Sequence, residues 1–151
     1  MGTNRGGLGT VSALAGTVVV GAAGAVGVRA AQERMRRNPA ILNETLRSYA
    51  ATIRWGDIAQ AQAFLDPKLR AEHPPSALEL ARFKQVQVSG YEEQPVSPVS
   101  ENEVRQIVQI GLVNVNTQSA RSIVDHQVWR YDDKARHWWL MSGLPDISRH
   151  E

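Results

Sequence analysis

The hydrophobic pattern of this 151-residue chain changes its period once, near residue 85, and this change restricts the fold to few architectures. Upstream, large apolar residues recur at spacings of four, three and four, which predicts an amphipathic helix. These residues are Leu42, Leu46, Tyr49 and Ile53. Downstream, apolar and polar residues alternate, which is the period of a half-buried strand. Helices followed by consecutive antiparallel strands predict an α+β fold with the helices packed on one face of a four-stranded sheet.

Local signals predict where the helices begin and end. Asn38-Pro39 opens the first helix, which ends near Trp55-Gly56. Asp57 to Gln60 has the spacing of a capping box and predicts a second helix. Asp66-Pro67 stops that helix and suits a further short turn. Ser76 to Glu79 is another capping box and predicts one more helix.

Alternation predicts four strands, separated by turn-forming residues. The segment Glu92 to Asn102 holds prolines and acidic and polar residues, so we expect a loop there. The adjacent Trp138 and Trp139 lie in the last strand and must point to opposite faces. The predicted strands are centred on Val86 and Val88, Val104 to Asn116, Arg121 to Tyr131, and Arg136 to Ser142.

A segment of different composition precedes the folded domain. Residues 6–28 contain no charged side chain and consist largely of Gly, Ala and Val. A helix of that length reaches across a bilayer core of about 30 Å. We therefore predict that residues 1–37 form an apolar membrane-targeting or membrane-spanning segment with a basic flank, and that residues 38–148 form the folded domain. The membrane is thus an expected partner, through residues 6–28.

The sequence allows two orientations of this segment. If residues 6–28 form an uncleaved helix, the arginine cluster between Arg29 and Arg37 would keep the domain on the cytoplasmic face. As a signal peptide, the segment would export the domain. Ser12 to Gly16 resembles the lead-in to a bacterial lipoprotein processing site, but Thr17 stands where that site requires a cysteine. We expect the envelope side, because the family resemblance described below points that way.

Charge and composition exclude several classes of site. The formal net charge is only +2, and the one dense group of basic residues flanks the apolar segment, so we expect no nucleic-acid partner. The absence of cysteine excludes disulfides, thiolate metal sites and cysteine nucleophiles. The four histidines are scattered without ligand spacing, and no phosphate-loop or zinc-protease motif is present. We therefore expect neither a metal nor a cofactor.

The candidate chemistry lies on the third predicted strand. Asp125 shares a face with Gln127 and Trp129, and with Tyr49 from the first helix these residues are candidates for a ligand pocket. Burial would raise the pKa of the Asp125 carboxyl toward that of a useful base. The alternative is a plainly polar face on which Asp125 pairs with an arginine. His126 faces the other side of the sheet, so it cannot form a dyad with Asp125.

Four tryptophans in a domain with two phenylalanines suggest a contact surface. At least one of Trp138 and Trp139 should lie on the outer face of the sheet, where an exposed indole often marks an interaction site. The alternative is that a helix or the C-terminal tail covers it.

Several short stretches between residues 40 and 147 follow one another in the order seen in a known protein family. They are Arg54-Trp55-Gly56-Asp57, Phe64-Leu65-Asp66-Pro67, Trp138-Trp139-Leu140 and Pro145. In this order the chain resembles the nuclear transport factor 2-like superfamily, and within it small bacterial envelope proteins, many of them lipoproteins. The resemblance implies a curved sheet wrapped around helices, which forms a cone with a pocket. The superfamily hosts isomerases, hydrolases, ligand binders and scaffolding domains, so the resemblance does not decide the activity.

We expect a non-catalytic, membrane-associated binding or assembly module of the bacterial envelope, acting as a homo-oligomer or with an envelope protein partner. The alternative is a protein that binds a small apolar ligand in its pocket. In that case Asp125 and Tyr49 would supply acid–base chemistry of the isomerase or hydrolase type.

Overall fold

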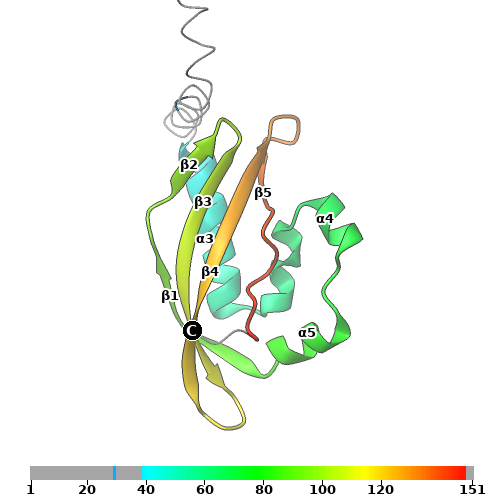
Figure 1. Cartoon of the computed structure of the whole chain (residues 1–151), viewed down its shortest axis with the longest axis vertical. Helices are drawn as coiled ribbons and strands as arrows, with labels where there is room; N and C mark the ends of the chain where they lie inside the picture. The colour runs from blue at the N-terminus through cyan, green and yellow to red at the C-terminus, as the bar shows by residue number, and fades with distance from the viewer. Residues whose placement is uncertain (1–28, 30–38, 149–151) are drawn as a thin grey trace, which may run out of the picture.

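A computed structural model of the chain describes residue 29 and residues 39–148 (Figure 1). The order of elements is helical first and then strand-rich, as the change of period predicts. The helical elements are α3 (Pro39–Trp55), the 3-10 helix η1 (Ile58–Phe64), α4 (Pro67–Glu72) and α5 (Ala77–Phe83). The strands are β1 (Val86–Glu93), β2 (Ser97–Ser100), β3 (Glu103–Asn114), β4 (Ala120–Asp132) and β5 (His137–Leu140).

The helices lie where the sequence predicts them, and two begin at the predicted capping boxes, whereas the predicted N-cap Asn38 lies outside the described residues. Asp57 accepts a hydrogen bond from the backbone N–H of Ala59, and the Gln60 side chain bonds back to the Asp57 N–H. Ser76 and Glu79 make the corresponding reciprocal pair at the start of α5. These caps satisfy N–H groups that the first turn of a helix leaves without partners.

The second helix is a 3-10 helix rather than the expected α-helix. The N–H of Gln60 donates to the Asp57 carbonyl, and the N–H of Leu65 donates to the Gln62 carbonyl. The helix has only seven residues before its C-cap Leu65 and Asp66-Pro67, and short helical pieces commonly adopt this tighter winding. Ile58, which the pattern predicts as buried, is buried as expected.

The sheet is antiparallel and has the strand order β1-β3-β4-β5, with β2 also paired to β3. The expectation of a loop from Glu92 to Asn102 is wrong in part, because β1 continues to Glu93 and β2 lies within that range. The edge position of β2 explains why Pro98 is tolerated, since one side of an edge strand needs no N–H donors.

The sheet curls around the helices, so that α3 lies against its concave face (Figure 1). Burial alternates along β3, where Val104, Val108 and Ile110 face the core. The same alternation turns Ile123 and Trp129 of β4 inward. The C-terminal segment is attached to this core through Arg121, whose guanidinium donates a hydrogen bond to the carbonyl of Ile147.

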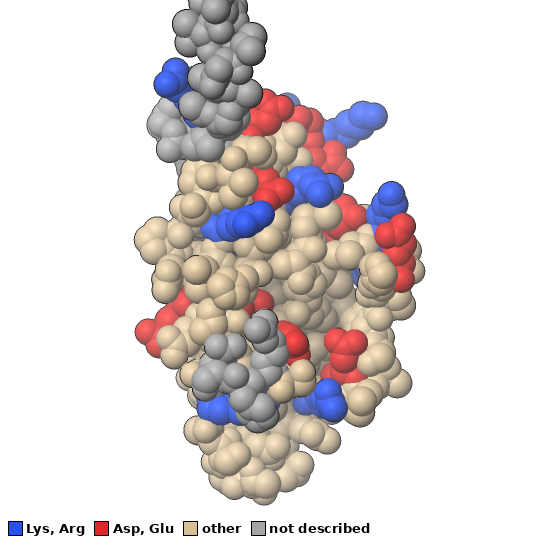
Figure 2. All heavy atoms as spheres, viewed as in Figure 1, with Lys and Arg blue, Asp and Glu red and all other residues tan. Residues whose placement is uncertain are grey.

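None of the helices in the described residues is long and apolar enough to cross a bilayer. The candidate segment at residues 6–28 lies outside the described residues, as does most of the range 1–37. In the view of Figure 2, acidic and basic side chains are intermixed on the surface of the domain.

Candidate functional site

Five side chains form a polar group on the concave face of the sheet, which we call the concave cluster. Gln127 lies at its centre. The Gln127 amide nitrogen donates to the Tyr91 hydroxyl and to an Asp125 carboxylate oxygen, each at 3.1 Å. The Gln127 amide oxygen accepts from the Trp129 indole N–H at 3.0 Å. The fifth member is Tyr49, which reaches the cluster from α3.

Tyr49 contacts the cluster through its ring. The ring packs edge-on against Trp129, with centroids 5.2 Å apart, and against Phe64 at 5.4 Å. The Tyr49 hydroxyl is buried and has no hydrogen-bond partner in the part of the chain that the structure describes. Burial, and then the nearby Asp125 and Tyr91, raise the pKa of the phenol well above its usual value. Tyr49 is therefore a neutral hydroxyl with an unused donor.

Asp125 is the acid of the concave cluster, and it is half-buried. Burial raises the pKa of its carboxyl above the ordinary value, while the hydrogen bond from Gln127 and the charge of His126 act in the opposite direction. The partner of Asp125 is Gln127 rather than an arginine. Its carboxylate is thus poised to bind a proton more readily than an exposed aspartate.

The concave cluster brings together all four residues that the sequence singles out for a pocket, namely Tyr49, Asp125, Gln127 and Trp129. Tyr91 is the member of the cluster that the sequence did not predict. It lies on β1, and the sequence of β1 does not indicate which residue of β4 it contacts. Tyr49, Gln127 and Trp129 are almost completely buried, so the protein's own side chains fill this part of the concave face. No group of three or more potential metal ligands occurs among the described residues.

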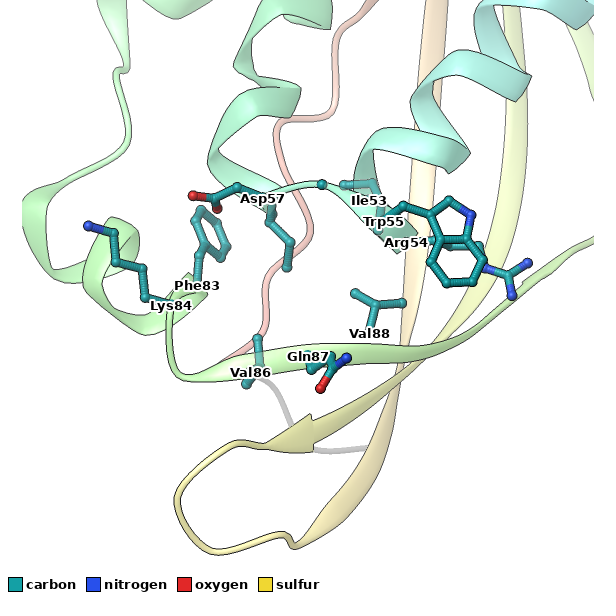
Figure 3. Close-up of a pocket in the computed structure, with 11 residues that line it drawn as sticks. Ile53, Arg54, Trp55, Asp57, Phe83, Lys84, Val86, Gln87 and Val88 are labelled. Atoms are coloured by element: carbon teal, nitrogen blue, oxygen red, sulfur yellow. The ribbon is translucent and has the colours of Figure 1, made fainter.

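A hollow of about 380 Å³ lies where α3 ends, and we call it the Trp55 hollow (Figure 3). Its floor is apolar and includes Ile53, Ile58 and Phe83, which are buried. Trp55 stands at its edge with 79% of its surface exposed. The Arg54 guanidinium lies 4.9 Å from the centroid of the Trp55 ring. The capping box of Asp57 and Gln60 fixes the turn that follows Trp55, and this turn also lines the hollow.

A second hollow, of about 430 Å³, lies on the convex side of the sheet beside the connection from β1 to β2. Four of its lining residues form what we call the convex-face patch: Arg105, Ile107, His126 and Val128. Ile107 is opposite His126 in the β3–β4 register, and Arg105 is opposite Val128. Ile107 exposes 38% of its surface, although β-branched apolar residues in a sheet are usually covered.

The two adjacent tryptophans of β5 point to opposite faces, as predicted. Trp138 is 3% exposed and packs beside Tyr131 in the core, so it forms no part of the surface. Trp139 is half-buried on the convex side, with its ring 4.0 Å from that of His137. His126 likewise lies on the face opposite Asp125. Of the two candidate surface residues, only Trp139 is available to a partner.

No protein-family model and no curated protein matches the chain. Among solved structures, a SEC-C motif containing protein from Psychrobacter arcticus is similar, with a TM-score of 0.50 and 11% sequence identity over 72% of this chain. The chain spans 62% of the length of that protein. At this level of identity the likeness concerns the fold alone.

Proposed function

We propose that the chain is a non-catalytic, membrane-associated binding or assembly module of the bacterial envelope, which holds a protein partner on its convex-face patch. One observation carries this proposal: Ile107 lies exposed beside a hollow on a sheet face that no helix of the described chain covers. The exposed Ile107 and the half-buried Val128 line this hollow together, and apolar side chains rimmed by polar ones are typical of interaction sites.

The contrast between the two sheet faces supports a binding role over a catalytic one. On the concave face, the inner side chains are packed against α3, and the concave cluster satisfies most of its polar atoms internally. On the convex face, the hollow is open and has the size of a typical recognition pocket. A partner side chain therefore has room on the convex face without any rearrangement of the core.

The charges around the convex-face patch suit a particular kind of partner. Arg105 contributes a cation that is shared with Glu103 at 3.4 Å, and the exposed His126 adds an imidazole that can form a hydrogen bond with a partner. Between them lies the apolar surface of Ile107. We expect an envelope protein that presents an apolar side chain next to a carboxylate.

The membrane and family parts of the proposal have separate support. The uncharged composition of residues 6–28 supports membrane association, on the envelope side or, from the basic flank, at the cytoplasmic face. The succession of helices and a curled antiparallel sheet supports a nuclear transport factor 2-like assignment.

Native mass spectrometry of the full-length protein, gently extracted from its membranes, tests the binding role. We expect a complex with a second protein. Ile107→Glu should abolish that complex, because it places a charge on the apolar surface. Gln109→Glu is the matched control, since it adds the same charge to an exposed position of the same strand and face, and it should retain the complex. A complex that survives Ile107→Glu would reject the convex-face patch as the binding site.

The second candidate function is binding of a small apolar ligand with acid–base chemistry. Two observations favour this candidate. The Tyr49 hydroxyl has no hydrogen-bond partner in the described chain, and the nearby Asp125 carboxyl has a raised pKa. Such a pair can hold and transfer a proton. In the same mass spectra, a small adduct that leaves on unfolding, and that is lost in Asp125→Asn, would favour this candidate over the assembly module.

A further inference from the structure

The Trp55 hollow carries the most exposed large apolar side chain in residues 39–148. Trp55 exposes 79% of its surface, and the next most exposed, Leu78, lies outside the hollow at 60%. Tryptophan is highly buried in most proteins, and where it stays at the surface it often supplies much of the energy of an interface. The volume of the hollow, about 380 Å³, is that of a recognition pocket.

The turn after Trp55 is rigid. The Gly56 N–H donates to the Thr52 carbonyl and closes the last turn of α3. A Cβ on Gly56 would lie 2.7 Å from the Gln60 amide oxygen and 3.0 Å from the Thr52 carbonyl oxygen, so the chain can turn this closely only at a glycine. The same Gln60 oxygen accepts the N–H of Asp57. An aromatic ring on a turn that is already fixed has little conformational freedom to lose on binding.

The inside of the hollow is apolar. Figure 3 shows the indole of Trp55 on one side and the Phe83 ring on the other, with Val86 and Val88 of β1 between them. Phe83 is buried, and the two valines are half-buried. An apolar side chain that enters between the two rings therefore meets apolar surface on both sides and at its base.

Two cations flank the hollow on opposite sides. Figure 3 shows the Arg54 guanidinium beyond the indole and the Lys84 side chain beyond the Phe83 ring. Both cations are exposed. Within residues 39–148, no carboxylate lies at ion-pair distance from either one, and neither side chain donates a hydrogen bond. Their charges are therefore available to carboxylates of a partner.

The charge of the hollow is positive because its one acidic lining residue is already engaged. That residue is Asp57, whose carboxylate accepts the N–H of Ala59 as the cap of η1. The Arg54 guanidinium is held over the Trp55 ring at 4.9 Å, which leaves the N–H groups at its edge to pair with a carboxylate.

We propose that the Trp55 hollow binds an acidic segment of a partner protein. One large apolar side chain of that segment enters the hollow, and carboxylates on either side of it reach Arg54 and Lys84. Charge complementarity selects this occupant. Two cations on opposite sides of an apolar pocket require two anions that flank an apolar group, which a peptide offers and a compact molecule with a single carboxylate does not.

The place of the hollow in the fold favours a protein segment over a lipid. The α3 helix begins at Pro39, next to the segment proposed to meet the membrane, and ends at Trp55. At 1.5 Å per residue these two ends lie about 24 Å apart. The hollow is at the Trp55 end, beside α5 and the start of β1 (Figure 1). A lipid headgroup at the Pro39 end therefore does not reach it.

This site is separate from the convex-face patch, with which it shares no lining residue. The two ideas therefore fail separately. Ile107→Glu should leave binding at the Trp55 hollow unchanged, and Trp55→Ala should leave the complex at the convex-face patch intact.

Isothermal titration of the full-length protein in detergent micelles tests the proposal with a defined probe. The probe is a five-residue peptide, blocked at both ends, with a central phenylalanine and two glutamates on each side. We expect saturable binding. A peptide with alanine at the centre, and one with glutamines in place of the glutamates, should each bind about tenfold more weakly or worse, because each lacks one of the two features that the hollow recognises.

Variants of the protein locate the site. Trp55→Ala should weaken binding by about tenfold or more, whereas Leu78→Ala, which also removes an exposed apolar side chain, should have no effect. Arg54→Gln and Lys84→Gln should each weaken binding by up to about fivefold. The matched control is Arg47→Gln, which removes an exposed cation of α3 outside the hollow and should leave the affinity unchanged.

Several results would overturn the proposal. Equal affinity for the glutamate and glutamine peptides would remove the role of charge, and full affinity in Trp55→Ala would remove the hollow as the site. Phenylacetate bound as tightly as the peptide would assign the hollow to a small carboxylate. Self-association that depends on Trp55, without any binding of the peptide, would assign it to a second copy of this chain.

Discussion

The indole N–H of Trp129 donates to the Gln127 side-chain oxygen, 3.0 Å away, in a part of the core where both side chains are buried. The two residues are neighbours on the concave face of β4. Because this bond uses the amide oxygen of Gln127, the amide nitrogen can donate hydrogen bonds to the Tyr91 hydroxyl and to the Asp125 carboxylate. A single amide therefore satisfies three polar groups that packing has removed from water.

Replacement of Gln127 should accordingly be costly. Gln127→Ala leaves the Trp129 N–H without a partner and opens a cavity, so we expect the free energy of unfolding to fall by roughly 2–4 kcal/mol. Gln109→Ala is the control: its side chain is exposed, its contact with the Ser122 hydroxyl is long at 3.4 Å, and the change should stay within about 0.5 kcal/mol. Urea unfolding followed by tryptophan fluorescence measures both. Equal losses would show that the buried network adds no stability.

The pH dependence of stability should carry the signature of Asp125. Its pKa is 3.8 in the unfolded chain and is raised in the folded protein. At a pH between the unfolded and the folded pKa, the folded protein therefore holds a proton that the unfolded chain has released. Stability therefore falls as pH rises through this window. The penalty of a buried charge persists above it. Asp125→Asn removes that penalty, so its stability relative to the unmodified protein should be greater at pH 7 than at pH 3. A difference that is constant with pH would contradict the raised pKa.

Two paired glycines of the sheet should respond oppositely to alanine. A Cβ on Gly111 would lie 2.7 Å from the Ser89 hydroxyl and 3.3 Å from the Gly90 nitrogen, whereas a Cβ on Gly90 would meet nothing within 4 Å. We expect Gly90→Ala to stabilise the protein by about 0.4–1 kcal/mol through the unfolded chain, and Gly111→Ala to destabilise it. Thermal unfolding distinguishes them. The combination Gly111→Ala with Ser89→Ala should recover part of the loss, and a failure to do so would locate the clash at the backbone.

The tryptophans should differ sharply in their effect on stability. Trp138→Ala removes a core side chain and should cost about 3–5 kcal/mol. Trp55→Ala changes an exposed residue and should stay within about 0.5 kcal/mol. Denaturant titration of the two variants provides the comparison. A large loss for Trp55→Ala would mean that its stacking with Arg54 holds the end of α3 in place.

The elements that could be predicted from the sequence depend on local chemistry. The capping boxes at Asp57 and Ser76 are confirmed because both partners lie within one helical turn. The grouping of Asp125, Gln127 and Trp129 on one face of β4 also follows from the sequence, since a period of two fixes which side chains share a face, although it does not say whether that face is the inner one. The same rule placed Asp125 and His126 on opposite faces and separated Trp138 from Trp139.

The elements that escaped prediction depend on long-range packing. Alternation cannot say which of Trp138 and Trp139 faces inward, because that depends on where the helices lie. β2 was missed because Pro98 signals a break unless the strand is known to be an edge. The contact between Tyr91 and Gln127 joins residues 36 positions apart, and no periodic signal connects them.

The abrupt end of the β4–β5 ladder has a consequence for hydrogen exchange. Along residues 121–127, the odd-numbered amides are bonded to β3, whereas the amides of Ser122, Val124 and His126 point away from β3 and have no backbone partner in residues 39–148. Neighbouring amides of one strand should therefore differ in protection, with Ile123 and Asp125 exchanging slowly while Val124 exchanges quickly.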